Sequence, residues 1–465
     1  MKIKLGKSEL IHFVGIGGIG MSGLALIMNE LGFKIQGSDI ANNKNIERLK
    51  KNKINIFIGH KKQNIKQSTI IVISSAIKKN NKELKAAKLK KLPVFQRGEM
   101  LANIVALKKN IVVTGSHGKT TTTSLVANIL VEAGLDPTVI NGGVINSLKN
   151  NAQLGKGEWA VIESDESDGS FLKLPITYSI VTNIDKEHLD YYGSFERLKK
   201  SFRSFIDKTP SFGKSLICID ENNLKSLLSK CKTNNFFTYG FEKNSNYQIT
   251  NVKREINYSI FDLRLKFTGN KIYKIKNIKV NLIGDHNISN ATAAIAIALN
   301  LGIQISKIKQ ALKKFLGIQR RFTKVFTIKK REFYDDYAHH PTEIRAVIKG
   351  ARQVYKDRKI ICVFQPHRYS RVKFLKNEFA LSFRSSDAVV LCPVYSAGEK
   401  IKHNFNQNSF SQLISKKSKT QVINIKDQKE LKNYFKKNLL DNEMVICMGA
   451  GSISNWIKEI GNELK

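Results

Sequence analysis

Residues 110–134 read NIVVTGSHGKTTTTSLVANILVEAG, an apolar run followed by a glycine-rich turn and an amphipathic stretch. A strand, a glycine turn and a helix in this order form the setting of a phosphate-binding loop. The spacing is T-G-x-x-G-K-T rather than the strict Walker form, because Val113 stands at the first glycine position. Lys119 can neutralise β- and γ-phosphate oxygens, and the Thr120 hydroxyl can bind Mg²⁺. The stretch therefore predicts an ATP-binding loop in a parallel α/β domain.

Short apolar runs alternate with longer amphipathic stretches along nearly the whole chain. This βαβ rhythm predicts parallel sheets covered by helices. It restarts near residues 10, 110 and 332, which predicts three domains in a chain of 465 residues. The predicted fold class is α/β, with N-terminal and C-terminal Rossmann-like domains flanking a central P-loop ATPase domain. The predicted boundaries are 1–106, 107–318 and 319–465.

Residues 235–283 have a different pattern, with apolar and polar residues alternating as in YSIFDLRLKF. Strict alternation is typical of strands with one exposed face. We expect antiparallel strands here that extend the sheet of the middle domain.

A second glycine loop lies near the N-terminus, in LIHFVGIGGIGMSGLA (10–25). Gly15, Gly17 and Gly20 form G-x-G-x-x-G between a strand and a helix, and Asp39 follows where a ribose-binding carboxylate would lie. The pattern alone leaves three interpretations open: a nicotinamide dinucleotide, another diphosphate nucleotide, or a turn that only packs helix on strand. A dehydrogenase needs no ATP loop, whereas a ligase acting on a nucleotide-linked substrate needs both loops.

Acidic residues follow the ATP loop in EWAVIESDESDGSF (158–171), with Glu163 at the end of a predicted strand. The next predicted strand ends at Asn183, and His188 lies just beyond it. Carboxyl ends of parallel strands meet at one edge of a sheet, so these residues are expected beside the loop. Thr120, Glu163 and His188 together are a plausible Mg²⁺ site. Taken singly, the acidic run is equally well a solvated turn.

The formal charge is +40, from 78 Lys and Arg against 38 Asp and Glu. Such a value invites a nucleic-acid-binding ATPase as an alternative. The excess is mostly Lys, scattered among Asn and Ile without an Arg-rich arm or a basic–aromatic stripe. We therefore expect anionic small substrates and no nucleic-acid partner.

Cellular location is suggested by the cysteines and by the apolar runs. The five cysteines lie far apart with no CxxC spacing, which is typical of free thiols in a reducing compartment. No apolar run approaches the ~20 residues that span a bilayer, and the N-terminus has no signal-peptide pattern. These patterns predict a cytoplasmic protein without stable membrane insertion.

Ten motifs in order, spread over essentially the whole chain, resemble those of the Mur ligase family, ATP-dependent amide-bond-forming ligases of cell-wall precursor synthesis. The motifs are GIGGIGMSG (15–23), TGSHGKTTT (114–122), ESDESDGSF (163–171), TNIDKEHLD (182–190), GDHNISNATAAIAIA (284–298), GIQRRF (317–322), DDYAHHPTE (335–343), FQPHRYSR (364–371), VYSAGE (394–399) and GAGSIS (449–454). The resemblance reassigns the first glycine loop to the pyrophosphate of a UDP-sugar.

The resemblance also implies roles for individual residues. The UDP-sugar site would contain Gly15, Gly17, Gly18, Gly20, Asp39, His60 and Ser74. The ATP site would contain Gly115, Ser116, His117, Gly118, Lys119, Thr120, Thr121, Asn287, Asn290, Arg320 and Arg321. The metal site would contain Thr120, Glu163 and His188, and the amino-acid site Tyr337, His339, Arg368 and Arg371. The catalytic set would be Lys119, Glu163, His188, His339 and Arg368.

Within the family, the motifs are closest to those of members that join L-alanine to the carboxylate of UDP-N-acetylmuramate through an acyl phosphate. A rival is the member that recycles whole murein peptides, which shares the HHPT motif but lacks the QPHRY form present here. Ser116 replaces the usual Thr, and Glu187 the usual Asp, so chemical type is kept. Several relatives carry a carbamylated lysine at a second metal, for which FERLKKSF (195–202) offers no clear match.

Overall fold

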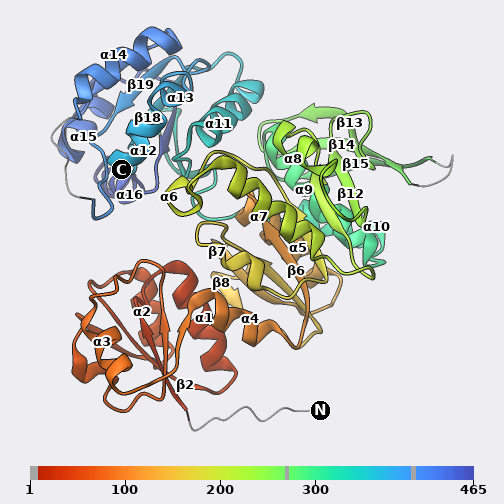
Figure 1. The fold of residues 1–465 in the computed structure, drawn as a ribbon. Helices are drawn as coiled ribbons and strands as arrows, with labels where there is room; N and C mark the ends of the chain where they lie inside the picture. Colours follow the sequence, from red (N-terminus) through yellow and green to blue (C-terminus); the bar gives the residue numbers. More distant parts are fainter. Residues whose placement is uncertain (1–8, 268–271, 400–404, 465) are drawn as a thin grey trace. The chain divides into compact units, whose positions relative to one another are not determined.

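The computed structural model describes residues 9–267, 272–399 and 405–464 (Figure 1). The first eight residues of the stretch expected to lack a signal peptide lie outside the described residues. Packing divides the chain into two compact units. The first holds the described residues of Met1–Val252, Phe261–Val280 and Ser289–Leu316, and the second those of Lys253–Ile260, Asn281–Ile288 and Gly317–Lys465. Within the described ranges, no helix is both long enough and apolar enough to cross a membrane.

The N-terminal part is a five-stranded parallel sheet in the order β3-β2-β1-β4-β5. Its strands are β1 (Leu10–Val14), β2 (Lys34–Asp39), β3 (Asn55–Ile58), β4 (Ile70–Ile73) and β5 (Val94–Gln96). Its helices are α1 (Ile19–Glu30), α2 (Lys44–Lys51), η1 (Lys62–Ile65), α3 (Lys82–Leu89) and α4 (Arg97–Val105). This is the strand order of a Rossmann-like half, as predicted. The carboxyl ends of β1 to β4 therefore share one edge of the sheet.

The central sheet has ten strands in the order β15-β14-β13-β12-β11-β10-β6-β9-β7-β8. The strands are β6 (Lys109–Thr114), β7 (Thr138–Ile145), β8 (Asn150–Gln153), β9 (Trp159–Glu163), β10 (Tyr178–Val181), β11 (Ser215–Cys218), β12 (Phe236–Gly240), β13 (Tyr247–Arg254), β14 (Ser259–Lys266) and β15 (Ile272–Val280). The helices are α5 (Lys119–Glu132), η2 (Ser170–Lys173), α6 (Leu189–Tyr192), α7 (Phe195–Asp207), α8 (Asn222–Leu228), α9 (Asp285–Asn300) and α10 (Ile305–Lys314). Strand β6, which precedes the ATP loop, pairs in parallel with β9 and β10 on either side.

The strands of residues 235–283 extend this sheet, as expected. Their direction was predicted wrongly in one place, because β12 pairs with β13 in parallel, with Tyr239 opposite Tyr247. Alternation reports which face of a strand is buried and carries no information about the direction of its neighbour.

The C-terminal part is a six-stranded sheet in the order β16-β17-β21-β18-β19-β20. Its strands are β16 (Thr323–Ile328), β17 (Arg331–Asp336), β18 (Ile360–Phe364), β19 (Ala388–Leu391), β20 (Gln421–Asn424) and β21 (Met444–Met448). Its helices are α11 (Pro341–Val354), α12 (Tyr369–Phe374), α13 (Lys376–Ala380), α14 (Gln407–Ser418), α15 (Gln428–Lys437) and α16 (Ile453–Leu464). All pairings are parallel except β16 with β17.

Both faces of the C-terminal sheet are buried. Cys362 and Phe364 of β18 point into one apolar layer, and Ile361 and Val363 into the other. A strand buried on both faces reads as a continuous apolar run, which is why ICVF was recognisable in the sequence. The described chain thus has three sheets, each covered by helices.

Candidate active site

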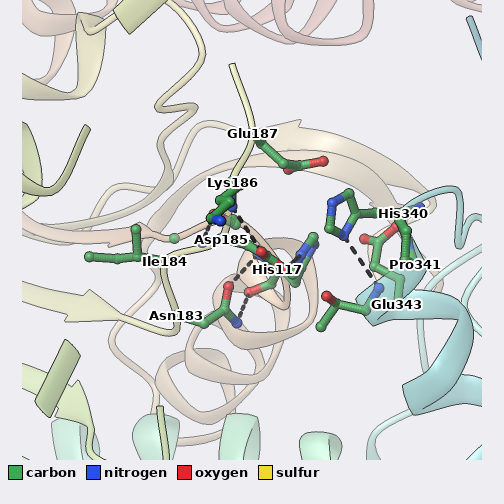
Figure 2. Close-up of polar contacts among 12 residues, drawn as sticks. His117, Asn183, Ile184, Asp185, Lys186, Glu187, His340, Pro341 and Glu343 are labelled. Carbon is green, nitrogen blue, oxygen red and sulfur yellow. Dashed lines mark hydrogen bonds and ion pairs between the residues drawn. The ribbon is translucent and has the colours of Figure 1, made fainter. Parts of the chain in front are cut away.

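The ATP loop is held against the carboxyl end of β10. The Ser116 N–H donates to the Asn183 carbonyl oxygen at 3.1 Å, and the His117 N–H donates to Asn183 Oδ1 at 2.8 Å. The His117 carbonyl oxygen accepts from Thr182 Oγ1 at 2.6 Å, and its ring Nε2 lies 3.2 Å from Asp185 Oδ2 (Figure 2). Because Gly115 has φ +132° and an added Cβ would lie 2.1 Å from Thr182 Oγ1, only glycine fits there.

Lys119, at the start of α5, is turned into this loop. Its Nζ donates to the carbonyl oxygens of Gly115 and Ser116 at 2.5 and 3.0 Å, and to Glu166 Oε2 at 2.8 Å. Burial works to lower the pKa of Lys119, but the carboxylates of Glu166 and Asp165 outweigh it, and the pKa is raised. The lysine is therefore a permanent cation at the helix N-terminus, where a phosphate group would bind.

Thr120 and Glu163 are in contact, as the metal-site prediction requires. Thr120 Oγ1 donates to Glu163 Oε1 at 3.0 Å, and the Gly142 N–H donates to Glu163 Oε2 at 2.5 Å. Thr121 is buried in the same first turn of α5. These oxygens are of the type that Mg²⁺ prefers.

His188, the third predicted metal ligand, lies beside a different acidic residue. Its Nε2 is 3.7 Å from Glu166 Oε1 and 4.0 Å from Glu187 Oε2. One ligand atom each from Asp165, Glu166 and His188 lie within 4.8 Å of one another. From the ESDESD run, the sequence predicted only Glu163 as a metal ligand. The contact with Lys119 and His188 identifies Glu166 as the missed residue.

The predicted UDP-sugar residues gather at the edge of the N-terminal sheet where β1 to β4 end. The Gly17 N–H donates to Asp39 Oδ2 at 2.8 Å, and the N–H groups of Gly15 and Ile16 donate to the Ser38 carbonyl oxygen. Gly15 has φ +82°. Gly18 precedes α1, and a Cβ at Gly20 would lie 3.2 Å from Arg97 Nη1. His60 follows β3, and Ser74 follows β4.

Two of the predicted ATP residues are asparagines of α9. A Cβ added at Gly118 would lie 2.7 Å from Asn290 Oδ1, so the Asn290 side chain lies directly against the ATP loop. Asn287 belongs to the other compact unit, and its Nδ2 donates to the Ile283 carbonyl oxygen at 2.8 Å. The described contacts thus place the Asn290 side chain against the ATP loop.

In the second unit, two guanidinium groups lie near the Tyr337 ring. The Arg320 and Arg321 guanidinium carbons are 4.8 and 5.5 Å from the centre of its ring. Arg320 also donates to the Gly449 carbonyl oxygen at 2.5 Å, and its Nε lies 3.6 Å from Asp335 Oδ2. The predicted ATP-site arginines and the predicted amino-acid-site tyrosine are therefore one cluster.

His339 lies in the turn that starts α11. Its ring Nδ1 is 3.0 Å from the Tyr337 carbonyl oxygen and 3.2 Å from Glu343 Oε2. His340 caps the helix, and Glu343 accepts from the His340 N–H at 3.3 Å, a capping box with Pro341 at the first helical position (Figure 2). The HHPTE motif thus forms the start of α11, and its Glu343 contacts and orients the His339 ring.

Arg368 and Arg371 follow β18: Arg368 is the N-cap of α12, and Arg371 lies within that helix. Arg368 has φ +69°, and its N–H donates to the Tyr395 carbonyl oxygen at 2.8 Å. His367, which sequence reasoning quoted in QPHRYSR but did not select, stacks on Tyr395 and meets His339 edge-on at 5.8 Å. Burial, followed by His339 and the two arginines, lowers the pKa of His367 to about 4, so the ring is neutral at physiological pH.

A Rossmann-like domain, a central P-loop domain and a third parallel α/β domain define a three-domain nucleotide-binding enzyme. The chain belongs to the Mur ligase family. Residues 10–109 match the Mur ligase family catalytic domain, 113–298 the Mur ligase middle domain, and 320–451 the domain described as Mur ligase, glutamate ligase domain. The family uses ATP.

Relatives of known name are similar over almost the whole length. The chain is 59% identical to the UDP-N-acetylmuramate–L-alanine ligase of Pelagibacter ubique, over 99% of both chains. It is 44% identical to the enzyme of the same name from Parvibaculum lavamentivorans, over 98% of this chain and 92% of that one.

Solved structures share the fold. The UDP-N-acetylmuramate–alanine ligase of Thermotoga maritima is 28% identical and superposes with a TM-score of 0.81, covering 98% of both chains. A murein peptide ligase of Psychrobacter arcticus, 22% identical, has a TM-score of 0.72 over 98% of this chain and 99% of that one. The latter likeness shows the fold alone.

Proposed function

We propose that this chain joins L-alanine to the muramate carboxylate of UDP-N-acetylmuramate, with ATP converted to ADP and phosphate, in peptidoglycan precursor synthesis. The observation that carries the proposal is the 59% identity, over 99% of both chains, with a ligase of that name. The reaction has two steps. The muramate carboxylate attacks the γ-phosphorus to give an acyl phosphate, and the amine of alanine then displaces phosphate from the carbonyl carbon.

The first step must bring a carboxylate against a triphosphate. At about 4 Å and an effective dielectric constant of about 20, each like-charge pair opposes approach by ~4 kcal/mol. The Lys119 ammonium is charged, lies at the helix N-terminus and donates a hydrogen bond to Glu166. The γ-phosphate would compete with Glu166 for it, and the ammonium would neutralise charge that grows in the transition state.

The residues beside Lys119 fit a divalent cation. Thr120 Oγ1 and Glu163 Oε1 are 3.0 Å apart. Glu166 Oε1 is buried and, among the described residues, has no hydrogen-bond partner. We propose Thr120, Glu163 and His188 as Mg²⁺ ligands, with Glu166 and Asp165 as the acidic partners of His188 that sequence reasoning missed. Bound Mg²⁺ would supply charge neutralisation and orientation of the phosphates.

Alanine would bind in the cluster at the carboxyl edge of the C-terminal sheet. Arg368 or Arg371 would grip its carboxylate through two parallel hydrogen bonds, which lysine does less well. Tyr337, together with Arg320 and Arg321 near its ring, would lie next to the ATP phosphates or ribose. His339 would orient the amine or accept its proton.

The UDP-sugar site and the cellular location are proposed from these substrates. The glycine loop after β1, with Asp39, His60 and Ser74, would bind the UDP-sugar. ATP and nucleotide sugars are cytoplasmic, and the described cysteines are free, so we propose a cytoplasmic location.

The test is phosphate release coupled to product mass, with the purified chain, Mg-ATP and UDP-N-acetylmuramate. Release with L-alanine and a product heavier by one alanyl residue would support the proposal. Glycine and L-serine would measure selectivity, and the peptide L-alanyl-γ-D-glutamyl-diaminopimelate would test the recycling alternative. Faster turnover with that peptide than with alanine would overturn the assignment of the amino-acid substrate. Stimulation by nucleic acid, or reduction of a nicotinamide coenzyme, would overturn the ligase assignment.

A further inference from the structure

A buried carboxylate lies beneath the first glycine loop and has no role in the function proposed above. Glu83, in the first turn of α3, is fully buried. Its Oε2 is 2.7 Å from Ser38 Oγ and 2.9 Å from His60 Nδ1. Its Oε1 is 2.5 Å from Asn64 Nδ2 and 3.7 Å from His12 Nε2. Four different segments of the N-terminal domain thus send a polar group to one carboxylate.

Local sequence turns Glu83 inward. Asn81 caps α3, its Oδ1 accepting the N–H groups of Glu83 and Leu84, so the helix begins at a defined residue. Leu84 and Ala87 pack in the same core as Ile71 and Ile73 of β4. A surface helix would place glutamate outward, and a buried ionised carboxylate is tolerated only where donors surround it.

The donors keep this carboxylate ionised. Burial works to raise the pKa of Glu83, but the nearby His12 ring and the hydrogen bonds from Ser38 and Asn64 outweigh it, and the pKa is lowered. An ionised carboxylate accepts hydrogen bonds and donates none. Each group that faces Glu83 must therefore turn a proton toward it.

This requirement determines which nitrogen of His60 carries a proton. Nδ1 has two neighbours, Glu83 Oε2 and Ser38 Oγ, and the latter is 3.0 Å away. The Ser38 hydroxyl proton is directed to Glu83, so both neighbours are acceptors toward Nδ1. Nδ1 is therefore the protonated nitrogen, and in the neutral ring Nε2, on the opposite side, is an acceptor.

The same network is joined to the glycine loop. The Ser38 carbonyl oxygen accepts the N–H groups of Gly15 and Ile16 at 2.8 and 3.0 Å, while its hydroxyl donates to Glu83. The next residue, Asp39, accepts the Gly17 N–H. His60 is mostly buried, with 15% of its side chain exposed at the sheet edge where these groups meet. Ser38 thus connects the polar groups around Glu83 and His60 to the glycine loop.

We infer that Glu83 is a positioning residue for the UDP-sugar, which holds His60 so that Nε2 accepts a hydrogen bond from a hydroxyl or N–H group of the uridine part. The inference rests on the proposed function. Replacing Glu83 with glutamine supplies an amide that can donate as well as accept. His60 Nδ1 can then lose its proton, and Nε2 can present a donor where the ligand also presents one.

The experiment compares E83Q, H60A and the double variant with the wild-type full-length chain. Dissociation constants for UDP and UDP-N-acetylmuramate are measured by calorimetry, together with KM and kcat. We expect E83Q to raise the dissociation constants and the KM for UDP-N-acetylmuramate about tenfold, since the hydrogen bond from the uridine part to His60 Nε2 is lost. The KM values for ATP and alanine should stay unchanged. The double variant should bind no more weakly than H60A, because Glu83 acts through His60.

Glu47→Gln is the matched control, since Glu47 is exposed on the surface of the same domain and accepts hydrogen bonds from Asn42 and Lys50. A folded E83Q chain with wild-type UDP affinity would overturn the inference, as would losses that add in the double variant. If E83Q does not fold, ¹⁵N-histidine spectra of the wild type decide, because an unprotonated Nδ1 at His60 would contradict it. Failure of the wild type to use UDP-N-acetylmuramate would instead overturn the proposed function, and UDP binding would still test Glu83.

Discussion

The two glycine loops of this chain follow parallel strands in the same way but use different chemistry. The loop after β6 carries Lys119, whereas the loop after β1 carries no cation and offers backbone N–H groups. Each domain has a fully buried glutamate near its loop: Glu166 near the loop after β6, and Glu83 near the loop after β1. Glu166 faces a permanent cation, and Glu83 faces hydroxyl, amide and imidazole groups. Neutralising the charge that develops during phosphoryl transfer needs a full positive charge, whereas binding a diphosphate can rely on backbone N–H donors.

The largest difference between the two loops is expected when Lys119 is replaced. We expect Lys119→Ala to lower kcat/KM by about a thousandfold, because the transition-state charge on the transferred phosphoryl group loses its counter-charge. UDP-N-acetylmuramate affinity, measured by calorimetry, should be unchanged. Lys109→Ala is the control, since Lys109 is half-exposed, pairs with the surface residue Glu158 and lies over the Trp159 ring. Near-normal turnover of Lys119→Ala would remove the distinction between the loops.

The two buried glutamates should differ in what their removal costs. Glu166→Gln removes the carboxylate that pairs with the Lys119 ammonium, and breaking such a buried pair costs about 3–5 kcal/mol. Glu83→Gln leaves hydroxyl, amide and imidazole partners, none of which is a permanent cation, so its cost should be smaller. Thermal and urea unfolding of both variants would measure this difference. ATP should restore more stability to Glu166→Gln than to the wild type, because its phosphates replace the lost carboxylate.

Glycine-to-alanine substitutions sharpen the comparison of the loop backbones. At Gly115 the new Cβ would overlap Thr182 Oγ1 at 2.1 Å, whereas at Gly15 its nearest atoms are 3.3 Å away. Gly134 has φ +81° with open space around it, so it measures backbone strain alone. We expect losses of unfolding free energy of about 1 kcal/mol at Gly134, slightly more at Gly15, and ~3 kcal/mol or more at Gly115. Equal losses at Gly15 and Gly115 would contradict the observed packing.

The smallest expected effect is on pH dependence. The pKa of Glu83 is lowered from its ordinary value of 4.5, so its stabilising contribution is complete above that value and is lost as pH falls through the folded-state pKa. Unfolding measured from about pH 5 to pH 3 should therefore show the wild type losing more stability than Glu83→Gln. Parallel curves would indicate that Glu83 is not the ionised acceptor described here.

Much of the fold was predictable because its signals are local. Gly15 and Gly118 are needed for their own positive φ angles, and Lys119 and Thr120 follow from the start of a helix. Apolar runs such as ICVF predicted buried parallel strands, and motif residues at strand ends predicted where sites would gather. The direction of β13 beside β12 was not predictable, because pairing depends on hydrogen bonds between segments.

The sequence by itself determined the strand–turn–helix units, the two loops, and the residue types that meet at the sheet edges, because backbone preference and apolar periodicity act over a few residues. The contacts of Glu166 with Lys119, of Glu83 with His60 and Ser38, and of Arg320 and Arg321 with the Tyr337 ring depend on how distant segments pack together. Glu83 is 45 residues from Ser38, and its neighbours in the chain resemble any surface helix. A carboxylate becomes a buried acceptor only when distant segments exclude water and supply donors together.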